Sequence, residues 1–489
     1  MLSSLTISEA HEQLKARKVR CTELVQACID RITVVDAQLN AVIYRNFDAA
    51  LAAAKKVDTE GGFDHLLTGI PYLTKDVYCE EGVPTTACSN ILREKNYIPP
   101  FDSTTTKRLK AVGAISLGKT NTDEFTMGAS TETSCHGSSR NPWDTTKTSG
   151  GSSGGSAAGV AASEGIFGLG TDTGGSIRQP AGLCGVCGLR PTYGRTSRYG
   201  VMSMASSLDT VGPLTRSVED IAIVLHAIAG KDPLDSTTAD TPVPDYHAEL
   251  KKGARGFKIG VPREYFIDGM SPDVEASVKA AAEVYRSLGA TVIDISLPHT
   301  KYSLATYYII CPSEVSSNMA RFDGIRFGHT VPKPGSLLDY HERVRSSGFG
   351  PEVKRRIMIG TYALSAGYYD AYYRQAQKVR TMIAQDFLDA FQKVDVIIAP
   401  VSPTPAFTVG AHIDDPVAMY LEDIFMDAVV MAGIPALAIP CGFSPVRNNV
   451  PQLPIGLQII GPQWQEGTIL RAAYAYEQAT QWHTMMPPL

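Results

Sequence analysis

The sequence predicts an α/β fold in which helices largely cover a central sheet. The chain has 489 residues with 44% hydrophobic content, which is enough to build a large buried core. A unit of helix, glycine and strand recurs at residues 104–117, 271–297 and 383–399. Repeated units of this kind are typical of α/β proteins, because each helix buries its apolar face on the sheet that the strands build.

The N-terminal residues 1–60 are predicted to be helical. Thr6 and Glu9 have the spacing of a capping box that opens a first helix. Residues 22–40 and 47–57 each keep an apolar stripe at helical period. A pair of glycines at 61–62 then ends this helical part and precedes the helix–strand units.

The second unit shows the pattern most clearly. Ser271 is predicted to cap a helix with Pro272 at its first position, and Gly289 ends it before a strand at 290–297. The buried face follows steps of four and three residues through Val274, Val278, Ala281, Tyr285 and Leu288. In the other two units the predicted helices are residues 104–112 and 383–393, and the strands are residues 114–117 and 394–399.

Charge and composition exclude several classes of protein. The formal charge of −5 supplies no strong positive field for a polyanion, so a partner would have to carry most contacts with any nucleic acid. The most apolar stretch, residues 424–443, contains Asp427 and two prolines and is predicted to be a buried helix and strand rather than a membrane span. The N-terminus lacks the apolar segment of a signal peptide. We therefore expect a soluble, cytoplasmic protein.

The nine cysteines show no disulfide framework and fit a reducing compartment. Cys184 and Cys187 form a C-x-x-C pair, but no second ligand pair lies at suitable spacing. We expect two small buried residues there, and no metal.

Residues 150–188 are rich in glycine, with 13 of the chain's 43 glycines. A flexible linker would not carry the apolar residues found here, so we expect a site built from backbone that approaches other groups closely. A phosphate-binding loop is excluded because no lysine follows the last glycine. The G-x-S-x-G spelling around Ser153 does not follow an apolar strand, which argues against the nucleophile elbow of the α/β-hydrolases.

Ser176 is the better candidate for a nucleophile. It follows two glycines, and successive backbone N–H groups there could stabilise a tetrahedral oxyanion. A serine nucleophile needs a base, and no His–Asp pattern is present. A neutral lysine can take this role, as in known Ser–Lys variants.

The sequence resembles the amidase signature family. The resemblance lies in GGSSGGSAAGVAA at 150–162, in GLGTDTGGSIRQPAGLCGVCGLRPTYGR at 168–195, and in G-I-P-x-x-x-K-D, which here ends with Lys75 and Asp76. It implies a large mixed central sheet covered by helices on both faces. It also implies a catalytic triad of Lys75, of Ser152 in a cis peptide, and of Ser176.

The resemblance also implies how these groups act. Lys75 would serve as the base, for which burial must lower its pKa to roughly 7–8. Ser152 would pass the proton between Lys75 and Ser176. The oxyanion hole would come from backbone N–H groups near Ser176, at Thr173, Gly174 and Gly175. Asp172 and Arg178 are expected to form a buried pair that shapes this loop.

The downstream half resembles one branch of the family, the A subunits of tRNA-dependent amidotransferases. The resembling segments are residues 306–328, 352–380 and 415–425. By this resemblance Arg356 would bind the carboxylate of glutamine, and Asp423 its ammonium. Tyr307 would also contact the substrate, with Tyr308 as the alternative.

This branch implies a glutaminase that supplies ammonia to amidate Glu-tRNA(Gln), Asp-tRNA(Asn) or both. The expected partners are B and C subunits, with the B subunit binding most of the tRNA, and no membrane is involved. No cofactor is expected in this chain, and ATP and Mg²⁺ would bind the partner. The alternatives are a stand-alone amidase acting on simple amides and a catalytically silent scaffold subunit.

We expect a single domain at 1–489 with four parts. These are the N-terminal helices (1–60), the core that carries the triad (61–230), a surface excursion (231–256) and a substrate-binding half that completes the sheet (257–489). Residues 231–256 are poor in large apolar residues and could also be a linker, but helix–strand units on both sides favour the excursion.

Overall fold

The structure is a computed structural model that describes residues 1–93, 97–332, 335–446 and 452–489. Its centre is an 11-stranded sheet of described strands in the order β1-β3-β2-β6-β8-β7-β12-β13-β11-β9-β10, and β4 and β5 form a separate ladder. The strands are β1 (Val42–Arg45), β2 (Pro71–Lys75), β3 (Ile115–Thr120), β4 (Arg140–Asn141), β5 (Asp144–Thr148), β6 (Phe167–Asp172), β7 (Cys187–Arg190), β8 (Thr210–Thr215), β9 (Lys258–Pro262), β10 (Thr291–Ile295), β11 (Val396–Pro400), β12 (Ala436–Phe443) and β13 (Pro454–Ile460).

The sheet is mixed. β2 runs parallel to β3 and β6, and β9 runs parallel to β10 and β11, while the other neighbours in the sheet pair antiparallel. The central strands β2, β6, β7, β8, β11 and β13 are buried along their whole length. Because both faces of these strands are buried, their sequences are runs of apolar residues and glycine rather than alternating apolar and polar residues.

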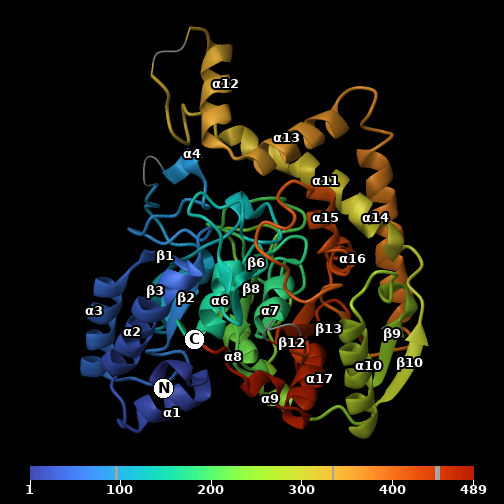
Figure 1. Cartoon of the computed structure of the whole chain (residues 1–489). Coiled ribbons are helices and arrows are strands. Elements are labelled where there is room, and N and C mark those ends of the chain that lie inside the picture. The colour runs from blue at the N-terminus through green and yellow to red at the C-terminus, as the bar shows by residue number, and fades with distance from the viewer. Residues whose placement is uncertain (94–96, 333–334, 447–451) are drawn as a thin grey trace.

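The helices pack around this sheet, and Figure 1 shows α1, α2 and α3 at one end, α10 beside β9 and β10 at the other, and α12 projecting from the body. The α-helices are α1 (Ile7–Lys15), α2 (Cys21–Leu39), α3 (Phe47–Glu60), α4 (Asn90–Arg93), α5 (Thr104–Ala111), α6 (Gly154–Ala161), α7 (Arg178–Cys184), α8 (Val218–Ile228), α9 (Tyr246–Leu250), α10 (Pro272–Ser287), α11 (Ser303–Asn318), α12 (Leu337–Gly348), α13 (Pro351–Leu364), α14 (Tyr373–Ala390), α15 (Pro416–Leu421), α16 (Asp427–Ala432) and α17 (Glu466–Ala479).

Helices cover both faces of the sheet, as the contacts of β7 demonstrate. A Cβ at Gly188 would lie 2.6 Å from Cβ of Ala181 in α7. Its neighbour Cys187 points instead to Glu477 of α17, with 3.9 Å between Sγ and Oε1. Because successive strand residues point to opposite faces, α7 and α17 lie on opposite sides of the sheet. The predicted α/β fold with a mixed sheet covered on both faces is confirmed.

The three predicted helix–strand units are present, with shifted bounds. They correspond to α5 with β3, α10 with β10, and α14 with β11. Ser271 occupies the N-cap position of α10, but its side chain makes no capping hydrogen bond, so Pro272 is the stronger start signal. At the N-terminus the predicted capping box of Thr6 and Glu9 is present.

Residues 1–60 contain the short strand β1 as well as helices. Within residues 231–256, α9 packs on α8 and α17. The division of the chain into four parts stays a prediction. The apolar stretch 424–443 forms α16 and β12, as predicted. No helix among the described residues combines the length and the apolar character needed to cross a bilayer.

Candidate active site

Lys75 lies at the carboxyl end of β2 and is fully buried. Its Nζ lies 2.7 Å from Oγ of Ser152, 2.9 Å from Oγ of Ser153 and 2.9 Å from Oγ1 of Thr171. Burial lowers the pKa of Lys75 to about 7, although Asp123 and Asp172 oppose part of this effect. The lysine is therefore a group that can be neutral near physiological pH and that already contacts hydroxyls.

The parallel pairing of β2 with β6 brings these groups together. Thr74 pairs with Leu169, so Lys75 and Thr171 both lie near the carboxyl ends of adjacent strands. The glycine–serine segment passes over this edge and continues into α6. The predicted triad members Lys75 and Ser152 thus meet although 77 positions separate them.

The peptide bond between Gly151 and Ser152 is cis, as the family resemblance implied. The backbone here is closely surrounded: a Cβ at Gly151 would lie 2.2 Å from Oδ2 of Asp123 and 2.6 Å from the backbone nitrogen of Ser130. Only glycine fits this position, which explains why the glycine-rich stretch is a packed site rather than a linker.

Ser176 lies in the loop between β6 and α7 and is nearly buried. Its carbonyl oxygen accepts a hydrogen bond from the backbone N–H of Ser153 at 3.1 Å, which places it beside the Lys75 cluster. No hydrogen bond joins the hydroxyls of Ser152 and Ser176 in the described part of the chain. The catalytic roles of Lys75, Ser152 and Ser176 stay predictions for which this geometry is suited.

The predicted oxyanion loop is held by carboxylates. Thr173 donates its hydroxyl to Asp209 at 2.7 Å, and the N–H of Gly175 donates to Oδ1 of Asp172 at 3.1 Å. Within the described residues, the N–H groups of Thr173, Gly174 and Ser176 have no acceptor. We keep the oxyanion hole as a prediction and place its free donors at Thr173, Gly174 and Ser176 rather than at Gly175.

Asp172 and Arg178 form the expected buried pair, with Nε to Oδ2 at 2.9 Å. Arg190, which the sequence did not point to, adds a second ion pair to Asp172 at 3.1 Å. Burial alone would raise the pKa of Asp172, but the two guanidinium groups hold it well below its usual value. This network fixes the loop that carries Ser176. Cys184 and Cys187 nearby are buried and unpaired.

A cavity of about 280 Å³ carries Arg356 on its wall, together with Glu124, Ser130, Tyr308, Glu352 and Tyr420. Arg356 is 3% exposed, and its Nε donates to Oε1 of Glu352 at 2.8 Å. Its guanidinium carbon lies 5.3 Å from the ring centre of Tyr308 and 5.6 Å from that of Tyr420. Held in this way, Arg356 keeps its Nη atoms available for an anion in the cavity.

The two tyrosines of α11 lie on different parts of the site. A Cβ at Gly174 would lie 2.7 Å from Oη of Tyr307, so Tyr307 abuts the predicted oxyanion loop. Tyr308 stacks on Tyr420 with 3.9 Å between ring centres and contacts Arg356. The structure brings both near the cavity, and the choice of Tyr307 over Tyr308 stays a prediction.

Asp423 follows α15 and is 6% exposed, and its Oδ1 has no hydrogen-bond partner among the described residues. Burial raises its pKa well above the usual range, and Arg356 opposes this effect. Asp427 shares this environment and was not singled out from the sequence as a site residue. The sequence analysis also did not identify Ser153 and Thr171 as contacts of Lys75. Ser153 could have been found, because it lies in the G-G-S-S-G-G motif beside Ser152.

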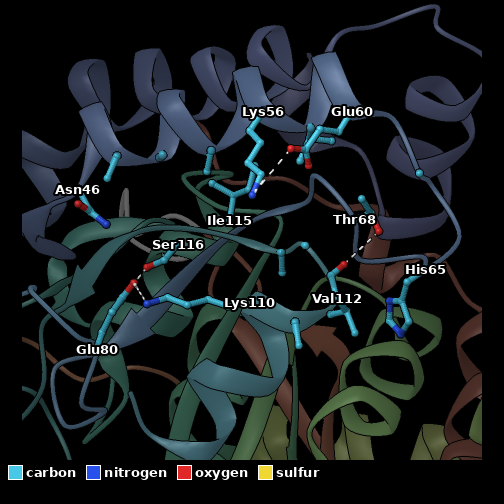
Figure 2. A pocket seen from close by; sticks show the side chains of 18 of the residues that line it. Asn46, Lys56, Glu60, His65, Thr68, Glu80, Lys110, Val112, Ile115 and Ser116 are labelled. Carbon is cyan, nitrogen blue, oxygen red and sulfur yellow. Dashed lines mark hydrogen bonds and ion pairs between the residues drawn. The ribbon is translucent and has the colours of Figure 1, made fainter. Parts of the chain in front are cut away.

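A larger hollow of about 780 Å³ lies elsewhere, between α3 and the start of β3 (Figure 2). Two ion pairs lie on its wall, Lys56 with Glu60 at 3.9 Å and Lys110 with Glu80 at 3.8 Å. It contains none of the predicted site residues, and no nucleophile and base meet in it. The smaller cavity has Arg356 and Tyr308 on its wall, whereas Lys75, Ser152, Ser176 and Asp423 do not line it. Gly151, next to Ser152, abuts Ser130 on its wall, so we take this cavity as the candidate active site.

Comparisons with known proteins identify the family of the chain. The family model named Amidase matches residues 23–470. The chain is 53% identical over 487 residues to the A subunit of the glutamyl-tRNA(Gln) amidotransferase of Geobacter sp. (strain M21), covering 99% of each chain. It is 54% identical over 491 residues to the protein of the same name in Roseiflexus sp. (strain RS-1), covering 100% of this chain and 99% of the relative.

Solved structures show the same fold. The crystal structure of the A subunit of glutamyl-tRNA(Gln) amidotransferase from Thermotoga maritima superposes with a TM-score of 0.82 at 39% identity, covering 100% of this chain and 98% of the other. The structure of 6-aminohexanoate cyclic dimer hydrolase complexed with substrate gives a TM-score of 0.85 at 25% identity, covering 99% of each chain.

Proposed function

Because the chain belongs to the amidase family, with full-length relatives among the A subunits of glutamyl-tRNA(Gln) amidotransferases, we propose that it is the glutaminase subunit of a tRNA-dependent amidotransferase. It hydrolyses the side-chain amide of glutamine through an acyl-serine intermediate. The observation that carries the proposal is the buried Lys75 in contact with Ser152, whose neighbour Gly151 abuts the wall of a cavity that presents a buried arginine.

The reaction begins with proton transfer. Neutral Lys75 accepts the proton of Ser152, Ser152 accepts that of Ser176, and Oγ of Ser176 attacks the amide carbon. The N–H groups of Gly174 and Ser176 stabilise the oxyanion, each typically by about 3 kcal/mol. When the C–N bond breaks, the proton returns through Ser152 to the nitrogen, which leaves as ammonia. Water then attacks the glutamyl ester and restores Ser176.

Selection of glutamine depends on its α-carboxylate and its α-ammonium. The Nη atoms of Arg356 pair with the α-carboxylate, and Asp423 receives the α-ammonium. A neutral amide offers neither charge and would leave Asp423 and the Nη atoms of Arg356 without a partner, which costs binding energy. This favours glutamine over simple amides and argues against a stand-alone amidase.

The released ammonia is used by partner proteins. We infer that a B subunit binds tRNA, ATP and Mg²⁺ and activates the tRNA-bound carboxylate, that a C subunit tethers the pair, and that the assembly works in the cytoplasm. The acceptor is Glu-tRNA(Gln), Asp-tRNA(Asn) or both. This chain's half-reaction requires no cofactor.

The test compares the purified chain with the complex obtained by coexpression with B and C subunits. Ammonia release is measured from glutamine and from a neutral primary amide of similar size. We expect a preference for glutamine, and a rate that responds to partners and charged tRNA. Faster turnover of the neutral amide, unchanged by partners and tRNA, would indicate a stand-alone amidase. A lack of turnover together with no labelling of Ser176 by a fluorophosphonate would indicate a scaffold.

A further inference from the structure

Asp427 is a second buried carboxylate beside Asp423. Neither the packing of the fold nor the predicted triad accounts for a carboxylate at this position. It is the first residue of α16, is 0% exposed, and neither of its carboxylate oxygens has a hydrogen-bond partner among the described residues. An unpaired carboxylate in a protein interior is unfavourable, so such groups are normally paired or serve a ligand. Two of them side by side call for an explanation.

The two arginines near Asp427 already donate hydrogen bonds to other groups. Arg178 donates from Nε to Asp172 and from Nη1 to Gln458 at 3.0 Å. The remaining Nη2 of Arg178 donates to Asp172 and to the carbonyl of Met426. The only hydrogen bond that the Arg356 side chain donates within the described residues runs to Glu352. No cation in this part of the chain therefore forms an ion pair with Asp423 or Asp427.

The unpartnered oxygens match the donors of an ammonium group in number. Oδ1 of Asp423 and both carboxylate oxygens of Asp427 are buried and without partners among the residues described, which makes three acceptors. An ammonium carries three N–H donors. The available Nη atoms of Arg356 supply the matching donors for a carboxylate. The site thus presents complementary groups for both ends of a free amino acid.

We propose that Asp427 and Asp423 together form the receptor for the α-ammonium of the substrate, so that Asp427 is a specificity-determining residue. This rests on the proposed function, because it takes glutamine as the substrate. The ammonium supplies the charge that the pair lacks, and an amide without an α-ammonium leaves both carboxylates unpaired.

The titratable and charged groups that face Asp427 come from several elements. They are Asp423, Arg178, Arg356, Asp172, Tyr265, Tyr307 and Tyr308. Burial, and then the Asp423 carboxylate, raise the pKa of Asp427 well above its usual range. An ammonium that binds beside the pair opposes both effects, so any proton carried by the empty pair is released. Binding of glutamine should release protons to the buffer.

The test uses the intact complex with Asp427→Asn. Initial rates are measured with glutamine and with glutaramate, which has the same amide and carboxylate but no ammonium. We expect the KM for glutamine to rise roughly 10- to 100-fold, as for loss of hydrogen bonds to a charged group, with a much smaller change in kcat. The kcat/KM for glutaramate should stay within about twofold. Calorimetry in buffers of different ionisation enthalpy should show less proton release on glutamine binding to the variant.

Glu164→Gln is the matched control, because Glu164 is fully buried with both carboxylate oxygens unpartnered in the described structure. The charged groups near it are Asp36, Arg31 and Arg45 rather than Asp423 and Arg356. It should leave the KM for glutamine unchanged. An unchanged KM for glutamine in Asp427→Asn, or an equal loss with glutamine and glutaramate, would overturn the inference. If Asp427→Asn does not fold, the wild-type complex decides: a kcat/KM for glutaramate equal to that for glutamine would refute it, because the ammonium would then contribute nothing to binding. If the wild-type complex does not hydrolyse glutamine, the proposed function itself fails.

Discussion

Lowering the pH from about 8 to about 6 should reduce the kcat for glutamine roughly tenfold through Lys75. With its pKa lowered to about 7 by burial, the neutral fraction of Lys75 falls from ~0.9 to ~0.1 over this interval. A lysine with the ordinary pKa of ~10.4 would be neutral in only about one molecule in a thousand at pH 7.5. Burial therefore increases the concentration of active base several hundredfold.

The direction of this pH effect follows from which protonation state of Lys75 is active. The base is the neutral amine, so activity rises with pH through about 7 and does not fall again because of this group. The assay measures ammonia release at saturating glutamine from about pH 5.5 to 9, with circular dichroism to verify folding at each pH. Lys75→Ala should lose 10²–10⁴-fold or more in kcat without loss of fold.

Glu124 is the necessary control for this profile. It lines the same cavity, and burial raises its pKa to about 7 as well. Its carboxylate accepts from Ser89 at 2.5 Å and from the backbone of Gly350 at 2.8 Å. In Glu124→Gln the rise of kcat near pH 7 should persist. A profile that is flat in the wild type, or a step that disappears in Glu124→Gln, would refute the assignment of Lys75 as the base.

Three further predictions concern binding, stability and packing. Arg356→Lys should raise the KM for glutamine about 10- to 100-fold, because an ammonium cannot replace the planar fork, and should change turnover of a neutral amide little; equal effects on both substrates would contradict this. Burial raises the pKa of Glu477 to about 8, far above its unfolded value, so its contribution to stability is present at low pH and is lost as pH rises through about 8. Glu477→Gln should therefore gain Tm relative to wild type between pH 5 and 8.5, and an offset independent of pH would count against it. Gly151→Ala should be inactive and less stable by at least ~2 kcal/mol in denaturant titration, because its Cβ would overlap Asp123; wild-type stability would show that the loop can adjust.

The sequence predicted the fold well where the chain is regular. The units at α5–β3 and α10–β10 are marked by glycines with positive φ, Gly113 and Gly289, which end each helix before its strand. The start of α14 was missed by ten residues, because Tyr373 and the polar residues after it leave no clear apolar stripe before Ile383. The strand β1 was missed because four residues between two helices show too little alternation to detect.

The candidate site was only partly predictable. Lys75, Ser152 and Ser176 lie in motifs that the family resemblance identified. Thr171 and Asp427 became visible only in the structure, because they reach the site through pairing of β2 with β6 and through packing of α16 against α11 and α14. No periodicity encodes such contacts between distant segments. Glu352 is different, because its ion pair with Arg356 spans one turn of α13 at a spacing of four residues, whereas the hydrogen bond that it accepts from Tyr420 comes from a distant segment.

The central claim is that glutamine is cleaved by way of an ester on Ser176. The most direct measurement mixes the complex with glutamine, quenches it in acid within one turnover, and maps modified peptides by mass spectrometry. We predict a single glutamyl group on the side chain of Ser176 that decays with the rate of ammonia release and is absent in Ser176→Ala. Ammonia release without an adduct at this serine, or an adduct on a different residue, would contradict the mechanism.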